Sequence, residues 1–369
     1  MKKIVKDFID RYLDNKGMRR LLVNLATIED LYSNTEKLRP FSSETINTSE
    51  AKEMPLYDRA KYLQQETYSL PDIYTVILSK VIYCPKYSVV LTNARKVISD
   101  SISTYKDPIR FSISELYLKK VEKISGICTI LRSTNNTYYH TLIDNIPRLY
   151  LLDRPQYKDL PEIKLLISSE PTKIESFFLD KCCPKNVKIT VTSAHQLYSV
   201  EKLIFPTFMT RRFSAYLPPE YLEYFLNKVG PQRSRNRINR IFISRVQTKK
   251  GSLRCILNEE ELFETLKKYG FKKYILENLS LQDQIELFYD AEYVVAAHGA
   301  GLANTIFSSK IKIIELFPTP FVIPHYYYLS KALGHTYRYW CSVEKSRDAN
   351  FRVNVSEISE IMANLERGK

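Results

Sequence analysis

The chain has 369 residues, 44% of them hydrophobic and 26% charged, a composition typical of a folded protein that can bury two domain cores. Its formal net charge of +14 at pH 7 predicts acidic partners. No apolar run approaches the roughly 20 residues that span a bilayer, and the six cysteines contain no Cys-x-x-Cys pair, so a membrane span, a disulfide framework and a structural zinc site are not expected.

Residues 1–65 are rich in charge and are predicted to form a helical N-terminal extension. Apolar residues recur at helical spacing between Ile4 and Tyr12, with lysines and arginines around them. Packing of this helix on the protein and peripheral docking on an anionic membrane surface both stay open. The first residues lack the uninterrupted apolar core of a signal peptide, so we expect a cytoplasmic location, at the inner face of the membrane if the helix docks there.

Residues 66–232 are predicted to form an N-terminal α/β domain. Strands are predicted over 75–84, 87–92, 163–168, 187–192 and 202–206, the first two as a hairpin. Helices are predicted over 138–152, 174–182 and 217–230. The last of these has proline at its start and Gly230 just past its end. The basic, proline-containing segment 230–237 marks the predicted domain boundary.

From residue 233 to 345 the predicted elements alternate regularly. Strands are predicted over 240–245, 271–277, 292–297, 312–317 and 336–343, and helices over 258–270, 280–291, 301–309 and 324–334. Such alternation predicts a Rossmann-like domain with a doubly wound, mainly parallel sheet. Residues 346–369 follow it as a closing C-terminal helix, predicted over 355–368.

One stretch, residues 233–254, has eight basic residues and no acidic one. It is compatible with a solvated surface, a phosphate-rich ligand or a nucleic acid. Nucleic-acid surfaces usually interleave aromatic side chains with the charges, and Phe242 is the only aromatic residue here. We therefore do not expect nucleic acid as a partner.

Ligands of open parallel sheets bind at the carboxyl ends of the strands. Candidate residues follow three of the predicted strands: Ser244 and Arg245; His298, Gly299, Ala300 and Gly301, with Asn304 in the helix that they open; and Glu315.

Each residue type suits a nucleoside diphosphate. The two glycines permit a tight turn and close backbone approach, and the following helix N-terminus offers N–H groups to an anion. Arg245 can bind a phosphate bidentately, and Glu315 can accept hydrogen bonds from ribose hydroxyls. His298 can donate to a phosphate or face the transferred group. Taken singly they are compatible with a turn glycine, a surface cation, an ion-pair partner or a core histidine; their common location predicts a ligand site. Because position 304 is asparagine, the Gly-x-Gly-x-x-Gly dinucleotide fingerprint is absent.

These motifs resemble glycosyltransferase family 61. The segments RIFISR, RCILNEEEL, HGAGLANTIF and IIELFP look like the catalytic domain of that family. The segment NTYYHTLIDNIPRL is similar to its N-terminal signature, with Thr141 where tryptophan is frequent. The resemblance covers about residues 130 to 340.

The resemblance implies a GT-B architecture, in which two Rossmann-like domains face each other across a cleft. It implies transfer of a sugar from a nucleotide diphosphate donor with inversion and without a metal or other cofactor, and the sequence contains no Asp-x-Asp motif. Arg245, Arg254 and the helix N-terminus after Gly301 would then neutralise the leaving diphosphate. The implied acceptor is a glycan or lipid-linked molecule in cell-surface polysaccharide synthesis.

An inverting transfer needs a base for the acceptor hydroxyl. His140 and Asp144 are four residues apart, so one helical face presents both, with Arg148 a turn further on, beyond Pro147. Either can be the base while the other orients it, and a purely structural pair is the alternative. A non-catalytic protein that binds nucleotide sugars or polysaccharides, and a nucleic-acid-binding protein, are the competing hypotheses for the chain.

Overall fold

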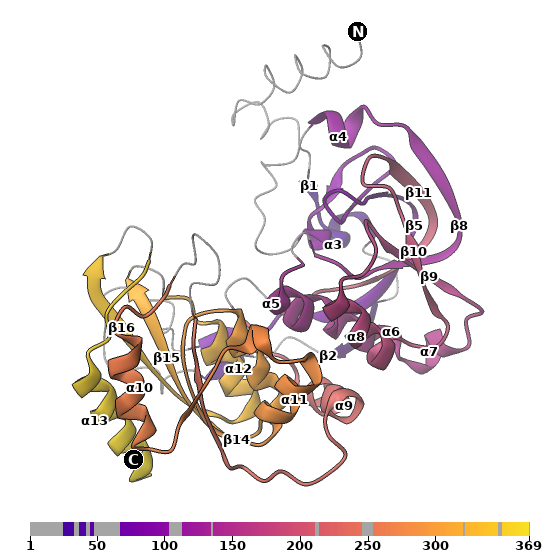
Figure 1. The fold of residues 1–369 in the computed structure, drawn as a ribbon. Coiled ribbons are helices and arrows are strands. Elements are labelled where there is room, and N and C mark those ends of the chain that lie inside the picture. The colour runs from indigo at the N-terminus through magenta and orange to yellow at the C-terminus, as the bar shows by residue number, and fades with distance from the viewer. Residues whose placement is uncertain are drawn as a thin grey trace. The chain divides into compact units, whose positions relative to one another are not determined.

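The computed structural model describes residues 25–32, 37–41, 45–47, 67–102, 113–133, 136–210, 214–245, 254–319, 322–345 and 349–368. The chain divides into two compact units (Figure 1). The first contains Met1–Ser43 and Pro71–Arg212, and the second contains Glu44–Leu70 and Phe213–Lys369. The helix expected between Ile4 and Tyr12 lies outside the described residues.

The described part of the first unit is built on a mixed sheet of nine strands. Its order is β1-β7-β6-β5-β11-β8-β9-β10, and β2 also pairs with β5. The bounds are β1 Leu25–Ala26, β2 Lys37–Phe41, β5 Ile73–Cys84, β6 Val89–Leu91, β7 Val97–Ile98, β8 Val121–Ile130, β9 Ile163–Ile167, β10 Val187–Val191 and β11 Leu197–Pro206. Along β5, Tyr83 packs in one apolar cluster and Ile82 in another, so both faces of the sheet are covered.

The predicted strands of this unit are confirmed, including the antiparallel hairpin of β5 and β6. Strand β8 is missing from the prediction. Its charged residues obscure the alternation, and Gly126, at a φ of +87°, lies where the register between β8 and β11 shifts. The extra residue of such a bulge breaks the period of two on which the strand prediction depends.

The expected all-helical extension over residues 1–65 is wrong where the structure describes it. Helix α3 (Ile28–Tyr32) is short, and strands β1, β2 and β3 (Thr45–Asn47) lie in the same segment. β1 pairs with β7, β2 with β5, and β3 with β4 (Thr67–Ser69). Pairing with strands distant in sequence outweighs the local preference of these residues.

The second unit contains a five-stranded sheet in the order β13-β12-β14-β15-β16. The strands are β12 Asn239–Ile243, β13 Lys272–Tyr274, β14 Ala291–Ala297, β15 Lys312–Thr319 and β16 Thr336–Lys345, and every pair is parallel. The predicted doubly wound parallel sheet is thus confirmed. When the five strands of this sheet are numbered in chain order, they lie in the order 2-1-3-4-5. The winding of the chain therefore reverses between β12 and β14.

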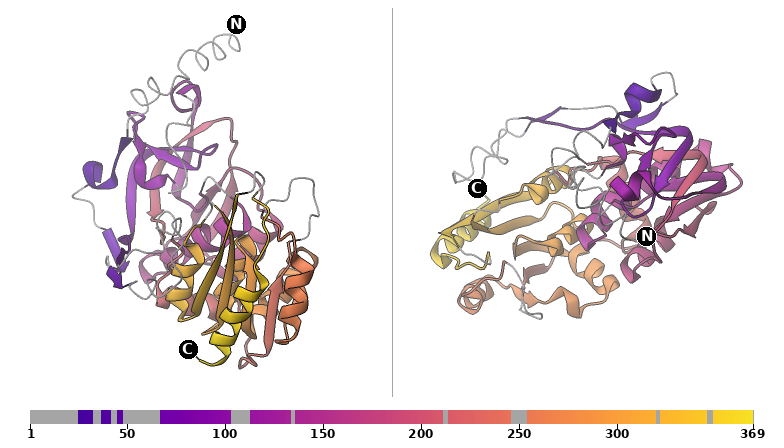
Figure 2. Two further views of the ribbon diagram at one scale, coloured as in Figure 1. Left: turned by 90° about the vertical axis from the view of Figure 1, so that its left-hand side faces the viewer. Right: turned by 90° about the horizontal axis from the view of Figure 1, so that it is seen from above.

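Helices cover both faces of this sheet (Figures 1 and 2). Helices α10 (Glu259–Lys267) and α13 (Val355–Glu366) lie side by side on one face, where Leu262 and Met362 share an apolar cluster. The 3₁₀-helix η6 (Ala300–Phe307) contacts both α11 (Leu281–Tyr289) and α12 (His325–Leu333). Right-handed crossovers from a central strand to neighbours on either side of it produce this two-layer covering.

The residues that begin or end two helices of this unit agree with the prediction. Ser280 caps α11 by accepting a hydrogen bond from the Asp283 N–H. Helix α9 (Pro219–Val229) begins at a proline and is followed by Gly230. This helix belongs to the second unit, where Phe225 stacks on Phe307 of η6, whereas the predicted boundary at 232/233 assigns it to the N-terminal domain. Among the described helices, none is long and apolar enough to cross a bilayer.

Candidate functional site

The sheet of the second unit reverses its winding between β12 and β14, and a cavity of about 150 Å³ opens at the carboxyl ends of these two strands. A sheet of this order binds ligands at such a switch point. Five predicted residues line the cavity: Ser244, Arg245, Gly299, Ala300 and Gly301. Residues that the sequence rule selects thus line one cavity at the carboxyl edge of the sheet. At this volume the cavity holds one part of a larger ligand, because complete ligand sites measure roughly 300–1,000 Å³.

Two arginines supply positive charge at this edge. Nη1 of Arg245 donates to the carbonyl oxygen of His298 at 3.1 Å, which ties the end of β12 to the end of β14. Arg254 is half-buried, and its pKa is lowered first by burial and then by the charge of Arg245. Within the described ranges neither guanidinium forms an ion pair with a carboxylate. Such a pair of cations is suited to an anionic ligand.

The glycines after β14 leave space for neighbouring groups. A Cβ atom on Gly299 would collide with the guanidinium of Arg245, and one on Gly301 would lie 2.9 Å from Cδ1 of Leu276. The hydroxyl of Tyr326 donates to the carbonyl oxygen of Gly299 at 2.7 Å and holds the turn. Ala300 and Gly301 at the start of η6 line the cavity, and the first N–H groups of a helix have no partner within it, so they are available to an anion.

Behind the turn, His298 belongs to a buried polar chain. Its Nδ1 lies 2.5 Å from Oε1 of Glu315, and the hydroxyl of Tyr337 donates to Oε2 at 2.5 Å. Burial lowers the pKa of His298 to about 3, and the charges of Arg254 and Arg245 act in the same direction. Burial raises the pKa of Glu315 to about 8. Both pKa shifts favour the uncharged forms of His298 and Glu315 near neutral pH.

Glu315 therefore does not reach a ribose as expected from the sequence. Strand β15 continues to Thr319, so Glu315 lies inside the strand rather than at its end. Its side chain is 0% exposed, and both of its oxygens have partners in the protein. In this geometry it orients His298.

The side chains of two other predicted residues form hydrogen bonds mainly with other groups of the protein. The hydroxyl of Ser244 donates to Glu259 at the start of α10, at 2.7 Å. The amide of Asn304 is buried and donates to the carbonyl oxygen of Gly301 and to Gln284. Ser244 borders the cavity, whereas Asn304 supports the turn from behind.

The prediction misses one wall of the cavity. Leu276 and Glu277 line it from the 3₁₀-helix η5 (Leu276–Asn278), which follows β13. A signal was present, because the strand predicted over 271–277 ends at Glu277. The carboxyl-end rule, applied to this strand as well, would have selected it.

The first unit brings His140 and Asp144 together. The helix predicted over 138–152 is one helical run: α5 (Tyr138–His140), the π-helix η4 (Thr141–Asn145) and α6 (Pro147–Leu152). Nδ1 of His140 lies 2.5 Å from Oδ2 of Asp144, and the hydroxyl of Thr210 donates to Oδ1 at 2.9 Å. The side chain of His140 is 12% exposed and that of Asp144 only 3%. Histidine is thus the more accessible member of the pair. Single π-turns often occur at functional sites.

Arg148, one turn further on, does not extend this pair. Its guanidinium is fully buried and donates to the carbonyl oxygens of Leu131 and Pro206. It also lies over the ring of Phe208, 4.4 Å from the centroid. Burial lowers the pKa of Arg148 to about 9. The residue clamps the ends of β8 and β11 together.

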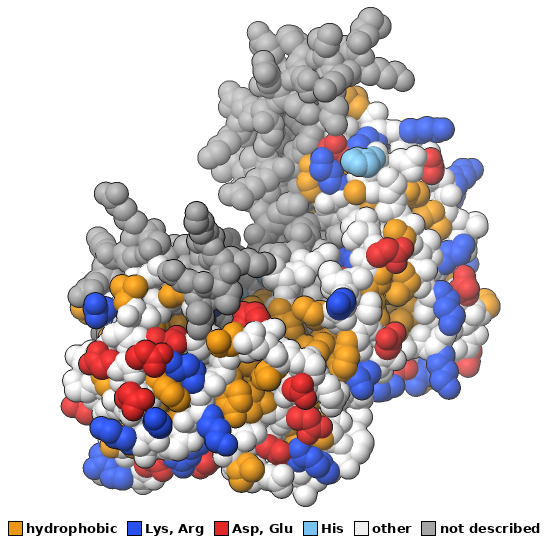
Figure 3. All heavy atoms as spheres, in the orientation of Figure 1, with side chains coloured by type: hydrophobic (Ala, Val, Ile, Leu, Met, Phe, Trp, Pro, Cys, Tyr) orange, Lys and Arg blue, Asp and Glu red, His pale blue; other side chains and the backbone are white. Residues whose placement is uncertain are grey.

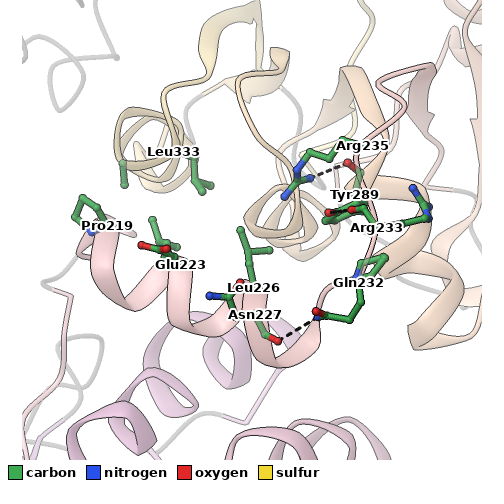
Figure 4. Close-up of a pocket in the computed structure, with 12 residues that line it drawn as sticks. Pro219, Glu223, Leu226, Asn227, Gln232, Arg233, Arg235, Tyr289 and Leu333 are labelled. Carbon is green, nitrogen blue, oxygen red and sulfur yellow. Dashed lines mark hydrogen bonds between the residues drawn. The ribbon is translucent and has the colours of Figure 1, made fainter.

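A larger cavity of about 500 Å³ lies in the second unit, between α9 and the end of α12 (Figure 4). Arg233, Arg235 and Tyr289 line it from segments that precede β12 and β14, so it lies at the amino ends of the strands. Arg233 is bonded to Asp290 and Glu286, and Arg235 to two main-chain carbonyl oxygens. Because this larger cavity lies at the opposite ends of the strands from the switch point, we assign the functional site to the smaller cavity.

The same contacts explain the first part of the basic stretch. Arg237 donates to the Lys310 carbonyl oxygen, and Arg240 pairs with Glu292 and Glu366. On the face of the second unit that Figure 3 shows, acidic and basic side chains are interspersed. The arginines of 233–240 thus bind the unit together, whereas Arg245 lines the smaller cavity.

Metal ligands are not grouped in the part of the chain that the structure describes. There, no cluster of three or more histidine, cysteine, aspartate or glutamate side chains is placed to hold an ion.

The model of the family Glycosyltransferase 61 matches residues 138–314. The β-1,2-xylosyltransferase of Arabidopsis thaliana is 28% identical over 124 residues, which cover 30% of this chain and 23% of the relative. The chain therefore matches less than a quarter of the relative's length. The family match includes His140, Asp144 and the cavity residues, and it ends one residue before Glu315.

Proposed function

We propose that this chain, whose residues 138–314 match the model of glycosyltransferase family 61, is a transferase of that family and moves a sugar from a nucleoside diphosphate donor to an acceptor hydroxyl with inversion at the anomeric carbon. The observation that carries this proposal is the cavity at the switch point. Its lining combines Arg245, a glycine turn and a helix N-terminus, and the charge of Arg254 acts on Arg245 from outside that lining. All three are suited to a diphosphate.

In the proposed step, the acceptor oxygen forms a bond to the anomeric carbon of the donor sugar. The bond from that carbon to the diphosphate oxygen breaks, and its electron pair leaves with the diphosphate. His140 takes the proton of the acceptor hydroxyl, and Asp144 orients its ring and stabilises the charge it gains. The exposure of His140 and the two occupied oxygens of Asp144 support this division of roles.

Arg245, Arg254 and the N–H groups after Gly299 are proposed to stabilise the charge that develops on the leaving diphosphate. His298, held by Glu315, is proposed to meet the diphosphate or the transferred sugar. Such a site neutralises the leaving group with fixed cations and dipoles, so the proposal includes activity without a metal. It also includes a GT-B arrangement, with the donor in the second unit and the acceptor in the first.

The acceptor is proposed to be a glycan or a lipid-linked molecule in cell-surface polysaccharide synthesis. The proposed location is cytoplasmic, with the basic N-terminal residues near an anionic membrane surface. The relative named above transfers xylose by its name, so UDP-xylose belongs in the donor panel.

The test uses the full chain with a panel of UDP- and GDP-sugars, in the presence and absence of EDTA. Binding of the donor is measured by calorimetry, and release of nucleoside diphosphate is measured with a mixture of glycan acceptors. We expect one donor to bind and to be turned over equally with EDTA. The absence of binding to every nucleoside diphosphate sugar would overturn the proposal, and loss of turnover in EDTA would overturn its metal-free form.

A further inference from the structure

Glu277 lines the wall of the smaller cavity to which the sequence analysis assigned no residue. Among the described residues that line this cavity, it provides the one carboxylate. No hydrogen bond or ion pair joins it to another described residue, and its side chain is exposed. Glu315, the carboxylate expected to bind the ribose, is fully buried and doubly bonded.

The turn that carries Glu277 is firmly held. The N–H of Asn278 donates to the carbonyl oxygen of Ile275 at 3.1 Å. The amide of Gln284 donates to the carbonyl oxygens of Leu276 and Leu279 at 2.9 and 3.3 Å. Leu276 packs where Gly301 has no side chain. The backbone that carries Glu277 is therefore fixed before a ligand binds, so binding does not have to order the turn.

The strand order sets the sequence of groups along the edge. From β13 to β12 to β14 the edge presents Glu277, then Arg245, then Gly299 and the start of η6. Neighbouring strands are about 4.8 Å apart, so the ends of β13 and β14 are separated by about 10 Å. The ribose and diphosphate of one nucleotide extend over a length of this order.

The charges allow only one orientation of such a ligand. A diphosphate is attracted to Arg245 and repelled by Glu277, whereas ribose hydroxyls are donors that a carboxylate accepts, as in dinucleotide-binding folds. Ile243, Leu276 and Leu302 add an apolar wall for the sugar ring. We propose that Glu277 accepts hydrogen bonds from the ribose hydroxyls of the donor nucleotide, an inference that rests on the proposed function. The nucleoside then lies on the β13 side, and the transferred sugar lies on the β15 side.

The test compares the full chain with Glu277→Gln and Glu277→Ala in binding UDP, GDP and their 2′-deoxy counterparts by calorimetry. The wild type should bind the ribonucleotide about 10- to 100-fold more tightly than the deoxyribonucleotide, because a hydrogen bond to a charged group is lost. Both variants should lose this preference and bind the deoxyribonucleotide as the wild type does. The matched control is Glu264→Gln, an exposed carboxylate on α10 that does not line the cavity, which should keep the preference.

The outcomes separate the inference from the function on which it rests. Failure of the wild type to bind any of the four nucleotides would overturn both. Normal binding with an unchanged ribose preference in Glu277→Gln would overturn only the role of Glu277. A change of the UDP-to-GDP ratio with the ribose preference intact would assign Glu277 to the base and likewise overturn the ribose contact. Equal melting temperatures of the variants show that the fold is kept.

Discussion

Nδ1 of His140 lies 2.5 Å from Oδ2 of Asp144 on one helical run of the first unit. The carboxylate is buried and its second oxygen accepts a hydrogen bond from Thr210, whereas the histidine ring is partly exposed. This asymmetry separates two residues that the sequence leaves equivalent: under the proposed function the more exposed histidine would meet the acceptor, and the buried aspartate would hold the histidine.

We expect His140→Ala and Asp144→Asn to lower the transfer rate by about 10²- to 10⁴-fold, since one removes the base and the other its orienting partner. Donor affinity, measured by calorimetry, should not change, because the cavity belongs to the other unit. His195→Ala, an exposed histidine of the same unit, is the control and should keep full turnover. A His140→Ala variant that turned over faster than Asp144→Asn would reverse the two roles.

Removing either Arg245, which lines the cavity, or Arg254, whose charge acts on Arg245, should weaken nucleoside diphosphate binding. A charge-assisted hydrogen bond contributes about 1.5–3 kcal/mol, so Arg245→Ala and Arg254→Ala should each raise Kd by about 10- to 100-fold. The control is Arg237→Ala, from the same basic stretch, whose guanidinium bonds to the Lys310 carbonyl oxygen. If Arg237→Ala weakened binding as much as Arg245→Ala, general charge rather than this cavity would hold the ligand.

Gly299→Ala should weaken donor binding by displacing Arg245. The backbone at Gly299 is extended, with a φ of 173°, so alanine is tolerated there and the added methyl group collides only with the guanidinium. We expect about a tenfold rise in Kd with little change in melting temperature. In the Arg245→Ala background the same substitution should have almost no further effect, because nothing remains to be displaced. Additive losses in the double variant would argue that Gly299 acts independently of Arg245.

The pKa of Glu315, raised by burial from its ordinary value of 4.5 to about 8, predicts a pH dependence of stability. Between these two values the folded protein keeps a proton that the unfolded chain has released, so raising the pH favours unfolding. The free energy of unfolding, measured in urea, should fall relative to that of Glu315→Gln by up to about 1.4 kcal/mol per pH unit in this window. A difference that is flat or rises from pH 4.5 to 8 would mean that Glu315 is ionised in the folded state.

Much of the second unit could be predicted from its sequence. Its strands and helices are long, strongly patterned and capped by residues such as Ser280, so each segment specifies its own type. Alternation of the two types implies a parallel sheet, and the carboxyl-end rule then locates Arg245 and Gly299. In the first unit the same reasoning fails at β8, where a bulge breaks the pattern, and at β1 and β2, where pairing with distant strands decides the structure.

The sequence by itself determined the chemistry that is available: a glycine turn after a buried strand, arginines in a stretch without acids, and a histidine four residues before an aspartate. These are local facts, because they depend on residue type and spacing along one chain. Only the tertiary structure decided which groups face a ligand. Strand order places Glu277 beside Arg245, and burial removes Glu315 to a supporting position behind His298. Neighbours across a sheet and exclusion from water are properties of the folded chain, and no spacing in the sequence encodes them.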